Sequence, residues 1–218
     1  IYTLSLHDAC PIYFNDGDSV ASVPIPLCND EVIYYSNIFA GPTSVSISRA
    51  KIDTNLYNSF DNEDLRKIIF FRSNIDGSHG FKGSYNGELT DLFNGIATDE
   101  LYLIRSECYA RMDNPVSAMQ DLNSLLMKRW KNGSFTPISV PDPEEALNFI
   151  LIERQKELIF RGIRWSDLRR LNKDPRFSTS LSRILNGNVY TLAPGDMRYT
   201  LLIPEQVINL TGIDQNSR

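Results

Sequence analysis

Apolar and polar positions divide the chain into a first part without a sustained period and a second part with helical spacing. Up to about residue 59, short apolar runs alternate with Pro, Asn and Ser, which favours irregular chain with one or two short strands or a short helix. Residues 58–71 place acids ahead of bases and end in an apolar run. They predict a turn or short helix that enters a strand at 67–72, and the four glycines in 74–87 then predict a loop.

From Thr98 onward the apolar positions recur at helical intervals. We expect Leu101, Ile104, Cys108 and Met112 to form the inward face of a helix that Thr98 caps. On that face Cys108 is interpreted as a small buried thiol. The chain contains no C-x-x-C or H-x-x-x-H spacing, so the sequence predicts neither a metal site nor a cofactor.

A second helix is predicted to start at Asn114, where Asn is followed by Pro at the first helical position. Only a few residues separate it from the first helix, so the two must fold back as an antiparallel hairpin. The hairpin has the size of a tetratricopeptide repeat and follows part of that consensus. The matching positions are Tyr102, Ser106, Tyr109, Ala118 and Leu122. Arg105 departs from it, because the consensus is apolar there.

A third helix is marked by Asp142 as cap, Pro143 as first residue and Glu145 three positions after the cap. Gly162 is expected to end this region in the left-handed conformation, and a short helix should follow at 164–171. The rest of the chain reads as irregular, with short strands around a turn at 194–195 and a last helical turn near 205–210.

Residues 153–171 carry six basic and three acidic side chains. The acids stand three or four positions before bases, which is typical of salt bridges on a helix rather than of a phosphate site. The expected pairs are Glu153–Lys156, Glu157–Arg161 and Asp167–Arg170. Arg154 shares the apolar stripe of the third helix, so it should be partly buried beside a carboxylate. We therefore predict a structural ion-pair corner formed by Glu153, Arg154, Glu157, Arg161, Asp167 and Arg170.

Length and charge narrow the classes of function. The chain has 218 residues, a formal net charge of −5 and a pI of about 5.1, which argues against nucleic-acid binding. No run reaches the ~18 apolar residues that cross a bilayer. Nucleophile-elbow, phosphate-loop and metal motifs are absent from the sequence, so we expect a protein that is not an enzyme.

Residues 1–12 are interpreted as foreign to the protein. Eleven of these twelve residues match the translation of a common sequencing-adapter DNA, with Cys10 as the exception. We expect this segment to be adapter-derived and to contribute nothing to function. His7 and Cys10 then carry no chemistry, and the native amino-terminal part is expected to be missing.

Three motifs, in order, resemble the carboxy-terminal half of the SusD/RagB family of surface nutrient-binding lipoproteins. They are the helix YLIRSECYAR (102–111) with the triplet DLN (121–123), the segment ERQKEL with RWSDLRR (153–170), and the tail LLIPEQ (201–206). The segment DLR (64–66) also looks like a family feature. The resemblance implies a mainly α fold of tetratricopeptide-like helical hairpins with long irregular loops and a few short strands. Residues 13–218 would form part of one domain, with a loop-rich segment (13–96), a hairpin (97–130) and a helical corner with an irregular tail (131–218).

The resemblance also implies a function. The protein would bind an oligosaccharide or polysaccharide without cleaving it, as the lid subunit of an outer-membrane uptake complex with a SusC-like TonB-dependent transporter. It would stand on the cell surface, attached to the membrane only through a lipid-modified cysteine in the missing amino-terminal part. The alternative is a tetratricopeptide-like adaptor that binds a protein or peptide partner, which requires a stack of about three repeats.

Sugar recognition needs exposed aromatic faces beside amide and carboxylate groups. Phe81 and Tyr85, in the glycine-containing segment, are our candidate ligand-binding residues. The alternative interpretation is that both rings fill the interior of the scaffold.

Overall fold

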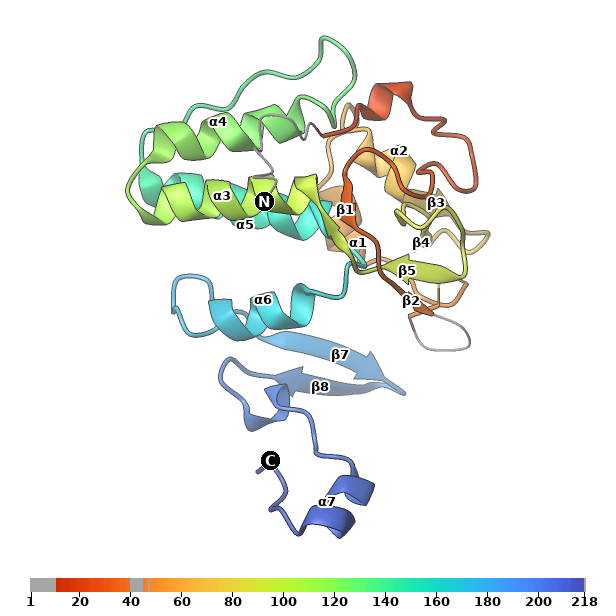
Figure 1. Cartoon of the computed structure of the whole chain (residues 1–218), viewed down its shortest axis with the longest axis vertical. Helices are drawn as coiled ribbons and strands as arrows, with labels where there is room; N and C mark the ends of the chain where they lie inside the picture. The colour runs from red at the N-terminus through yellow and green to blue at the C-terminus, as the bar shows by residue number, and fades with distance from the viewer. Residues whose placement is uncertain (1–10, 40–44, 47, 218) are drawn as a thin grey trace, which may run out of the picture. The chain divides into compact units, whose positions relative to one another are not determined.

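A computed structural model describes residues 11–39, 45–46 and 48–217 of the chain (Figure 1). The chain forms two compact units, and the boundary between them follows Gly162. The helices of the first unit are η1 (Phe14–Asp16), α1 (Thr54–Asn58), α2 (Arg66–Phe70), α3 (Thr98–Arg111), α4 (Pro115–Leu126) and α5 (Pro143–Glu157). Its strands are β1 (Val32–Tyr34), β2 (Asn37–Phe39), β3 (Phe71–Ser73), β4 (His79–Phe81), β5 (Asp91–Phe93) and β6 (Ile96–Ala97). The predicted mainly α fold with a few short strands is confirmed.

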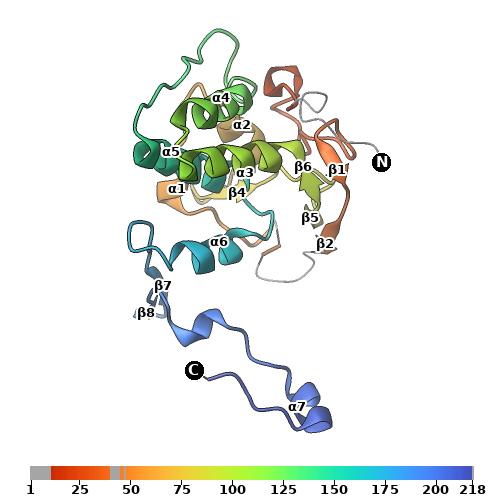
Figure 2. The ribbon, with the colours of Figure 1, turned by 60° about the vertical axis from the view of Figure 1, so that its left-hand side comes forward.

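The three long helices form the body of the first unit. Helix α3 packs against both α4 and α5, and α3 and α4 form the predicted hairpin (Figures 1 and 2). The side chain of Asn114 accepts a hydrogen bond from the N–H of Ser117, and that of Asp142 accepts one from the N–H of Glu145. Such a cap contributes about 1 kcal/mol. Thr98, in contrast, is the first residue of α3 rather than its cap.

The hairpin is held by the small and polar residues that the repeat pattern indicated. The Oγ of Ser106 donates to the carbonyl of Ala118 at 2.7 Å, which requires the two helices to approach closely. Arg105, the apparent exception, donates through Nε and Nη2 to the carboxylate of Asp121 on α4. A bidentate pair of this kind fixes the register of the helices while the guanidinium edge stays partly solvated.

The predicted inward face of α3 is wrong. Ile104, Cys108 and Met112 are exposed, so Cys108 is not the buried thiol that we expected. The buried positions are Thr98, Asp99, Tyr102, Leu103, Ser106, Glu107 and Ala110. The reason is that α4 and α5 cover the side of α3 where small residues allow close packing, whereas the bulkier apolar residues at the predicted spacing lie on another side.

Short antiparallel ribbons pair β1 with β6, β2 with β5 and β3 with β4. The strand predicted at 67–72 is mostly helix α2, and only its end belongs to β3. Aromatic rings dominate the core beneath these ribbons: Phe70 contacts Phe14 and Phe81, and Phe60 meets Phe71 edge to face at 5.2 Å between centroids. The loop-rich segment therefore carries a core of its own.

The linker between α4 and α5 is fastened by one side chain. Asn123 donates from Nδ2 to the carbonyl of Ile138 at 2.8 Å, and its Oδ1 accepts from the N–H of the same residue at 2.9 Å. One amide thus satisfies both backbone groups of Ile138, as a neighbouring strand would. This contact gives the last residue of the DLN triplet a structural role.

The second unit contains α6 (Arg164–Leu171), β7 (Leu181–Leu185), β8 (Asn188–Leu192), η2 (Met197–Tyr199) and α7 (Glu205–Thr211). The predicted helices at 164–171 and near 205–210 are confirmed. The turn predicted at 194–195 is present, with a φ of 75° at Gly195, but only β8 precedes it and no strand follows it directly; the paired strands β7 and β8 are joined instead at Asn186–Gly187. Both turn residues have positive φ, of 50° and 78°, which suits the Asn-Gly pair of a two-residue hairpin.

Candidate functional site

The two candidate sugar platforms are not on the surface. Phe81 is 3% exposed and Tyr85 is 1% exposed. Phe81 pairs with Phe71 across the β3–β4 ribbon and stacks on Phe160 at 4.7 Å between ring centroids. The hydroxyl of Tyr85 donates to Glu31 at 2.6 Å. The prediction that these rings are exposed is wrong, since both help to fill the interior of the first unit.

Glycines explain why this segment is drawn inward. A Cβ at Gly83 would lie 2.4 Å from Cδ1 and 2.8 Å from Cα of Phe70, so only glycine allows this approach. A Cβ at Gly87, which has a φ of +69°, would lie 2.7 Å from the backbone nitrogen of Leu27. The glycines that we interpreted as marks of an exposed loop therefore permit close packing of the backbone against the core.

The ion-pair corner forms in part as predicted. Glu153 accepts from Lys156 at 2.9 Å, and in the second unit Asp167 accepts from Arg170 at 2.8 Å. Arg154 is buried as expected and finds a distant acid, Glu100 of α3, at 3.3 Å.

The remaining predicted pair, Glu157 with Arg161, is replaced by other partners. Arg161 donates to Asp99 at the start of α3, and Glu157 accepts from Arg66 and Arg129. Contacts across the fold thus replace the local pairing that helix spacing suggested.

Two fully buried arginines organise the network. Arg66 of α2 donates to Asp64, to Glu153 at 2.6 Å and to Glu157 at 3.0 Å. Arg129, after the end of α4, donates to the second oxygen of Glu157 at 2.7 Å, to Glu31 at 2.7 Å and to the carbonyl of Ile12. We call the whole set the buried brace. Its charged members are Glu31, Asp64, Arg66, Asp99, Arg129, Glu153, Glu157 and Arg161.

Burial and charge shift the pKa values in the brace. Burial alone would lower the pKa of Arg66 and of Arg129, but the carboxylates around each outweigh it and raise both pKa values well above the ordinary one. Burial also raises the pKa of Glu31, although the charge of Arg129 opposes this shift. Although burial opposes the shift, the charges of Arg66 and Lys156 hold the pKa of Glu153 below its usual value. The brace is closed to solvent, so it is a structural element and not a ligand site.

Sequence reasoning missed several members of the brace. Asp64 and Arg66 belong to the DLR segment, whose spacing could have drawn attention to a buried pair. Glu31 and Arg129 pair with each other although they lie 98 residues apart in the chain, so no local pattern in the sequence indicates the pair. Only the fold brings them together.

Exposed aromatic residues gather instead on the segment that contains β1 and β2. Tyr34 is 62% exposed, Tyr35 37% and Phe39 69%. Phe39 lies directly opposite Asp91 across the β2–β5 ribbon, and the amide of Asn37 donates to the Asp91 carboxylate. We call Tyr34, Tyr35, Asn37, Phe39 and Asp91 the aromatic ribbon face.

Two acidic groups lie close to Tyr35 of this face. Burial, followed by the charges of Glu88 and Asp91 and a smaller effect of Cys28, raises the pKa of the Tyr35 hydroxyl. Tyr35 therefore stays protonated near neutral pH and can donate a hydrogen bond, while the two carboxylates can accept them. An aromatic surface flanked by such donors and acceptors suits a polyhydroxylated ligand.

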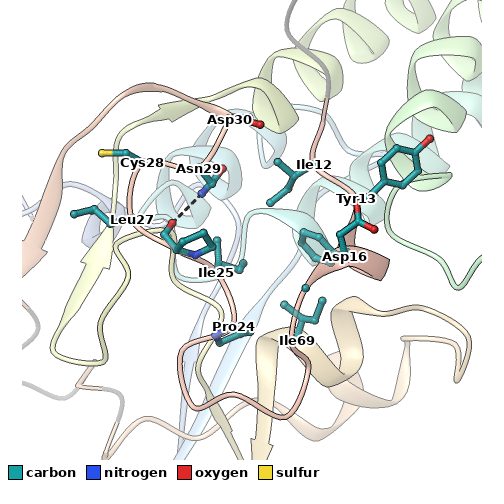
Figure 3. A pocket seen from close by; sticks show the side chains of 13 residues that line it. Ile12, Tyr13, Asp16, Pro24, Ile25, Leu27, Cys28, Asn29, Asp30 and Ile69 are labelled. Atoms are coloured by element: carbon teal, nitrogen blue, oxygen red, sulfur yellow. Dashed lines mark hydrogen bonds between the residues drawn. The ribbon is translucent and has the colours of Figure 1, made fainter.

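A groove of about 370 Å³ opens nearby, and Cys28 belongs to its lining (Figure 3). It runs between residues 13–17 and 24–30, next to Ile12 of the segment interpreted as adapter-derived. Its remaining apolar lining includes Phe14, Pro24, Ile25 and Ile69, and its polar lining includes Asp16, Asn29 and Asp30. Asn29 is held by donating to the carbonyl of Pro26. The groove combines an apolar interior with carboxylates, which again suits hydroxyl groups on a ring with apolar faces.

Of the segment interpreted as adapter-derived, residues 1–10 with His7 and Cys10 lie outside the described chain, and its origin stays a prediction. Ile12 is described and donates its N–H to Glu31 at 2.8 Å. Within the described residues no group of His, Cys, Asp and Glu side chains is arranged to hold a metal ion. No helix there has both the length and the apolar character needed to cross a membrane.

Comparison with known proteins finds one family model that matches: the model of the SusD family matches residues 98–202. This match confirms the resemblance to that family seen in the motifs. No curated protein matches the chain.

Solved structures give the same fold. A SusD-like carbohydrate binding protein from Bacteroides vulgatus is 17% identical, with a TM-score of 0.61, 94% of this chain covered and 51% of that one. A SusD superfamily protein from Bacteroides thetaiotaomicron is 20% identical, with a TM-score of 0.63 and coverages of 91% and 50%. A third, from Parabacteroides distasonis, is 11% identical, with a TM-score of 0.65 and coverages of 97% and 54%. The chain thus spans about half the length of these proteins.

Proposed function

We propose that the protein binds a saccharide nutrient without breaking it, as a subunit of an outer-membrane uptake complex. The match of residues 98–202 to the SusD family model supports this, as does the similarity of the fold to a protein described as carbohydrate binding. The partner would be a SusC-like TonB-dependent transporter, and a lipid anchor would hold the protein at the cell surface.

The observation that carries the proposal is the aromatic ribbon face. The rings of Tyr34 and Phe39 are largely exposed, and Asp91 and Asn37 place a carboxylate and an amide beside Phe39. A sugar ring presents apolar C–H faces to such aromatic rings and directs its hydroxyl groups to the polar side chains. Scaffold ribbons fix the residues, while their side chains remain open to a ligand.

The neighbouring groove would extend the site to a longer chain of sugars. Its carboxylates Asp16 and Asp30 are exposed and can accept hydrogen bonds from the hydroxyl groups of a sugar. Tyr13 at its edge is covered on one ring face by the ammonium of Lys128, at 3.3 Å from the centroid. That cation–π contact leaves at most one face of this ring for a ligand.

Calorimetry of the full chain against a panel of neutral polysaccharides tests the proposal. Replacing Tyr34 and Phe39 together by Ala should weaken binding by about 5- to 150-fold, from the loss of two stacking contacts of about 0.5 to 1.5 kcal/mol each. Tyr190→Ala is the matched control, because Tyr190 is also exposed but lies on β8 of the second unit. Equal affinity of the double variant and the wild type would remove the aromatic ribbon face as the site.

Two further measurements distinguish the proposed binding role from that of an enzyme and from that of a tetratricopeptide-like adaptor. A bound oligosaccharide recovered after prolonged incubation should be unchanged on chromatography, and shortened products would indicate an enzyme. Pull-down of the full-length protein from outer membranes should recover a TonB-dependent transporter. Recovery from the cytosol with a peptide partner would favour the tetratricopeptide-like adaptor instead.

A further inference from the structure

The second unit contains a pocket of its own. It has a volume of about 230 Å³ and is formed by the end of α6 and by the residues around η2. Liquid water occupies ~30 Å³ per molecule, so the pocket has room for a ring-sized ligand rather than a single small ion. Its polar lining includes Arg169, Asn172, Lys173, Asp196 and Tyr199.

The uncompensated charge in this pocket is positive. Arg169 and Lys173 are exposed, and neither forms an ion pair with any residue of the described chain. The one carboxylate of the lining, Asp196, is already engaged by Arg198 at 2.7 Å. Hydrogen bonds from Arg198 lower the pKa of Asp196 to about 2, so this pair stays charged and internally neutral. Two cations therefore face the pocket in a protein whose net charge is −5.

Two hydrogen-bond donors at the pocket are also unused. The Nδ2 of Asn172 and the hydroxyl of Tyr199 are buried and have no hydrogen-bond partner among the described residues. The Oδ1 of Asn172 accepts from the N–H of Thr179 at 2.9 Å, which fixes the amide so that Nδ2 remains a free donor. Buried donors normally form hydrogen bonds, so we expect each of these two groups to bind an acceptor atom.

Packing holds one residue of the lining in place. The ring of Tyr199, 6% exposed, packs on Trp165 at 4.8 Å between centroids, and the indole N–H donates to the Tyr199 carbonyl at 3.1 Å. The apolar surface of the pocket comes from Met197, whose exposed side chain can contact the C–H face of a ring.

We propose that this pocket binds a sugar acid, with the carboxylate of a hexuronate between Arg169 and Lys173 and its hydroxyl groups near Asn172 and Tyr199. A guanidinium and an ammonium are the groups that recognise a carboxylate through charge-assisted hydrogen bonds. The aromatic ribbon face belongs to the other unit and lies close to acidic groups, so it does not supply selectivity for a negatively charged sugar. The proposal therefore stands whether or not that face binds neutral sugars.

Titration of the 218-residue chain with glucuronate, followed by NMR, tests the pocket. Saturable binding should shift the side-chain amide signals of Asn172, and glucose should bind at least about tenfold more weakly, because it cannot form the charge-assisted hydrogen bonds. Replacing both cations, Arg169→Gln with Lys173→Gln, should weaken glucuronate binding about tenfold or more. Arg183→Gln, an exposed charge on β7 outside the pocket, is the control and should leave affinity unchanged.

Four outcomes would overturn the proposal. Three are no saturable binding of glucuronate by the folded wild-type chain, equal affinity for glucose, and equal losses in the pocket variant and the Arg183→Gln control. Inorganic phosphate is the competing probe: if it displaces glucuronate at lower concentration than glucuronate itself binds, the pocket is a general anion site and not a sugar-acid site. As a second variant, Tyr199→Phe keeps the ring and removes only the unused hydroxyl, so a several-fold loss of affinity is expected in a chain that still folds.

Discussion

Replacing Arg129 by Met should strongly destabilise the first unit. Its guanidinium is fully buried and donates to Glu157, to Glu31 and to the carbonyl of Ile12, and it lies over the ring of Phe14 at 4.2 Å. Met fills similar volume but leaves two carboxylates buried without this partner. Breaking a buried ion pair in this way costs about 3 to 5 kcal/mol, which is a large part of the ~5 to 15 kcal/mol that stabilises a typical domain.

The assay is urea unfolding at neutral pH, followed by tryptophan fluorescence. The chain has two tryptophans, Trp130 in the first unit and Trp165 in the second. A Trp165→Phe background therefore makes the signal report on the first unit, immediately beside the substitution. Lys131→Met is the matched control, because its partner Glu63 and the lysine itself are both nearly half exposed. Loss of such a surface pair should cost less than about 1 kcal/mol.

Equal losses for Arg129→Met and Lys131→Met would refute the brace as a stabilising element. The double variant Arg129→Met with Glu31→Gln gives a second check, since neutralising one stranded carboxylate should recover part of the lost stability. Additive losses in that cycle would show that Arg129 and Glu31 do not interact energetically.

Other predictions concern pH, packing and thiol exposure. Burial raises the pKa of Glu31 above 4.5, so the folded state binds the proton of Glu31 more tightly than the unfolded chain does. The free energy of unfolding should therefore fall as the pH rises from 4.5 through the folded pKa. Urea titrations at several pH values should show that Glu31→Gln lacks this part of the pH dependence. Gly83→Ala should cost about 1 to 3 kcal/mol in urea unfolding because its Cβ collides with Phe70, whereas Gly17→Ala, whose nearest contact would be 3.4 Å, should be tolerated. Cys108 should react readily with a thiol reagent in the native chain, and Cys108→Ser should change stability by less than about 0.5 kcal/mol; slow labelling would restore the buried interpretation.

The cap-plus-proline signals at the starts of α4 and α5 were reliable. Asp142 followed by proline marks the start of α5 because the cap depends only on residues within one turn. The repeat spacing likewise placed Ser106 at the contact between α3 and α4. Hydrophobic spacing alone failed for Ile104 and Met112, because it reports apolar residues and not which neighbour covers them.

The candidate site was harder to predict, since it depends on which backbone segments approach one another. Phe81 and Tyr85 stand among glycines, and glycines serve equally in an open loop and at a tight contact. The contact of Gly83 with Phe70 shows the second use. Among the loop aromatics, exposure distinguishes Tyr34 and Phe39, and exposure becomes visible only when the ribbons are assembled.

The two hydrogen bonds between Asn123 and Ile138 indicate where the chain can tolerate insertions. Because one amide fixes the far end of the linker, residues between Trp130 and that point form a closed surface loop whose length is not dictated by the helices. Lengthening a flexible loop costs little, about 0.6 kcal/mol for each doubling. Insertions there should leave α5 in register, so this stretch is a natural place to attach an epitope or a fluorescent label.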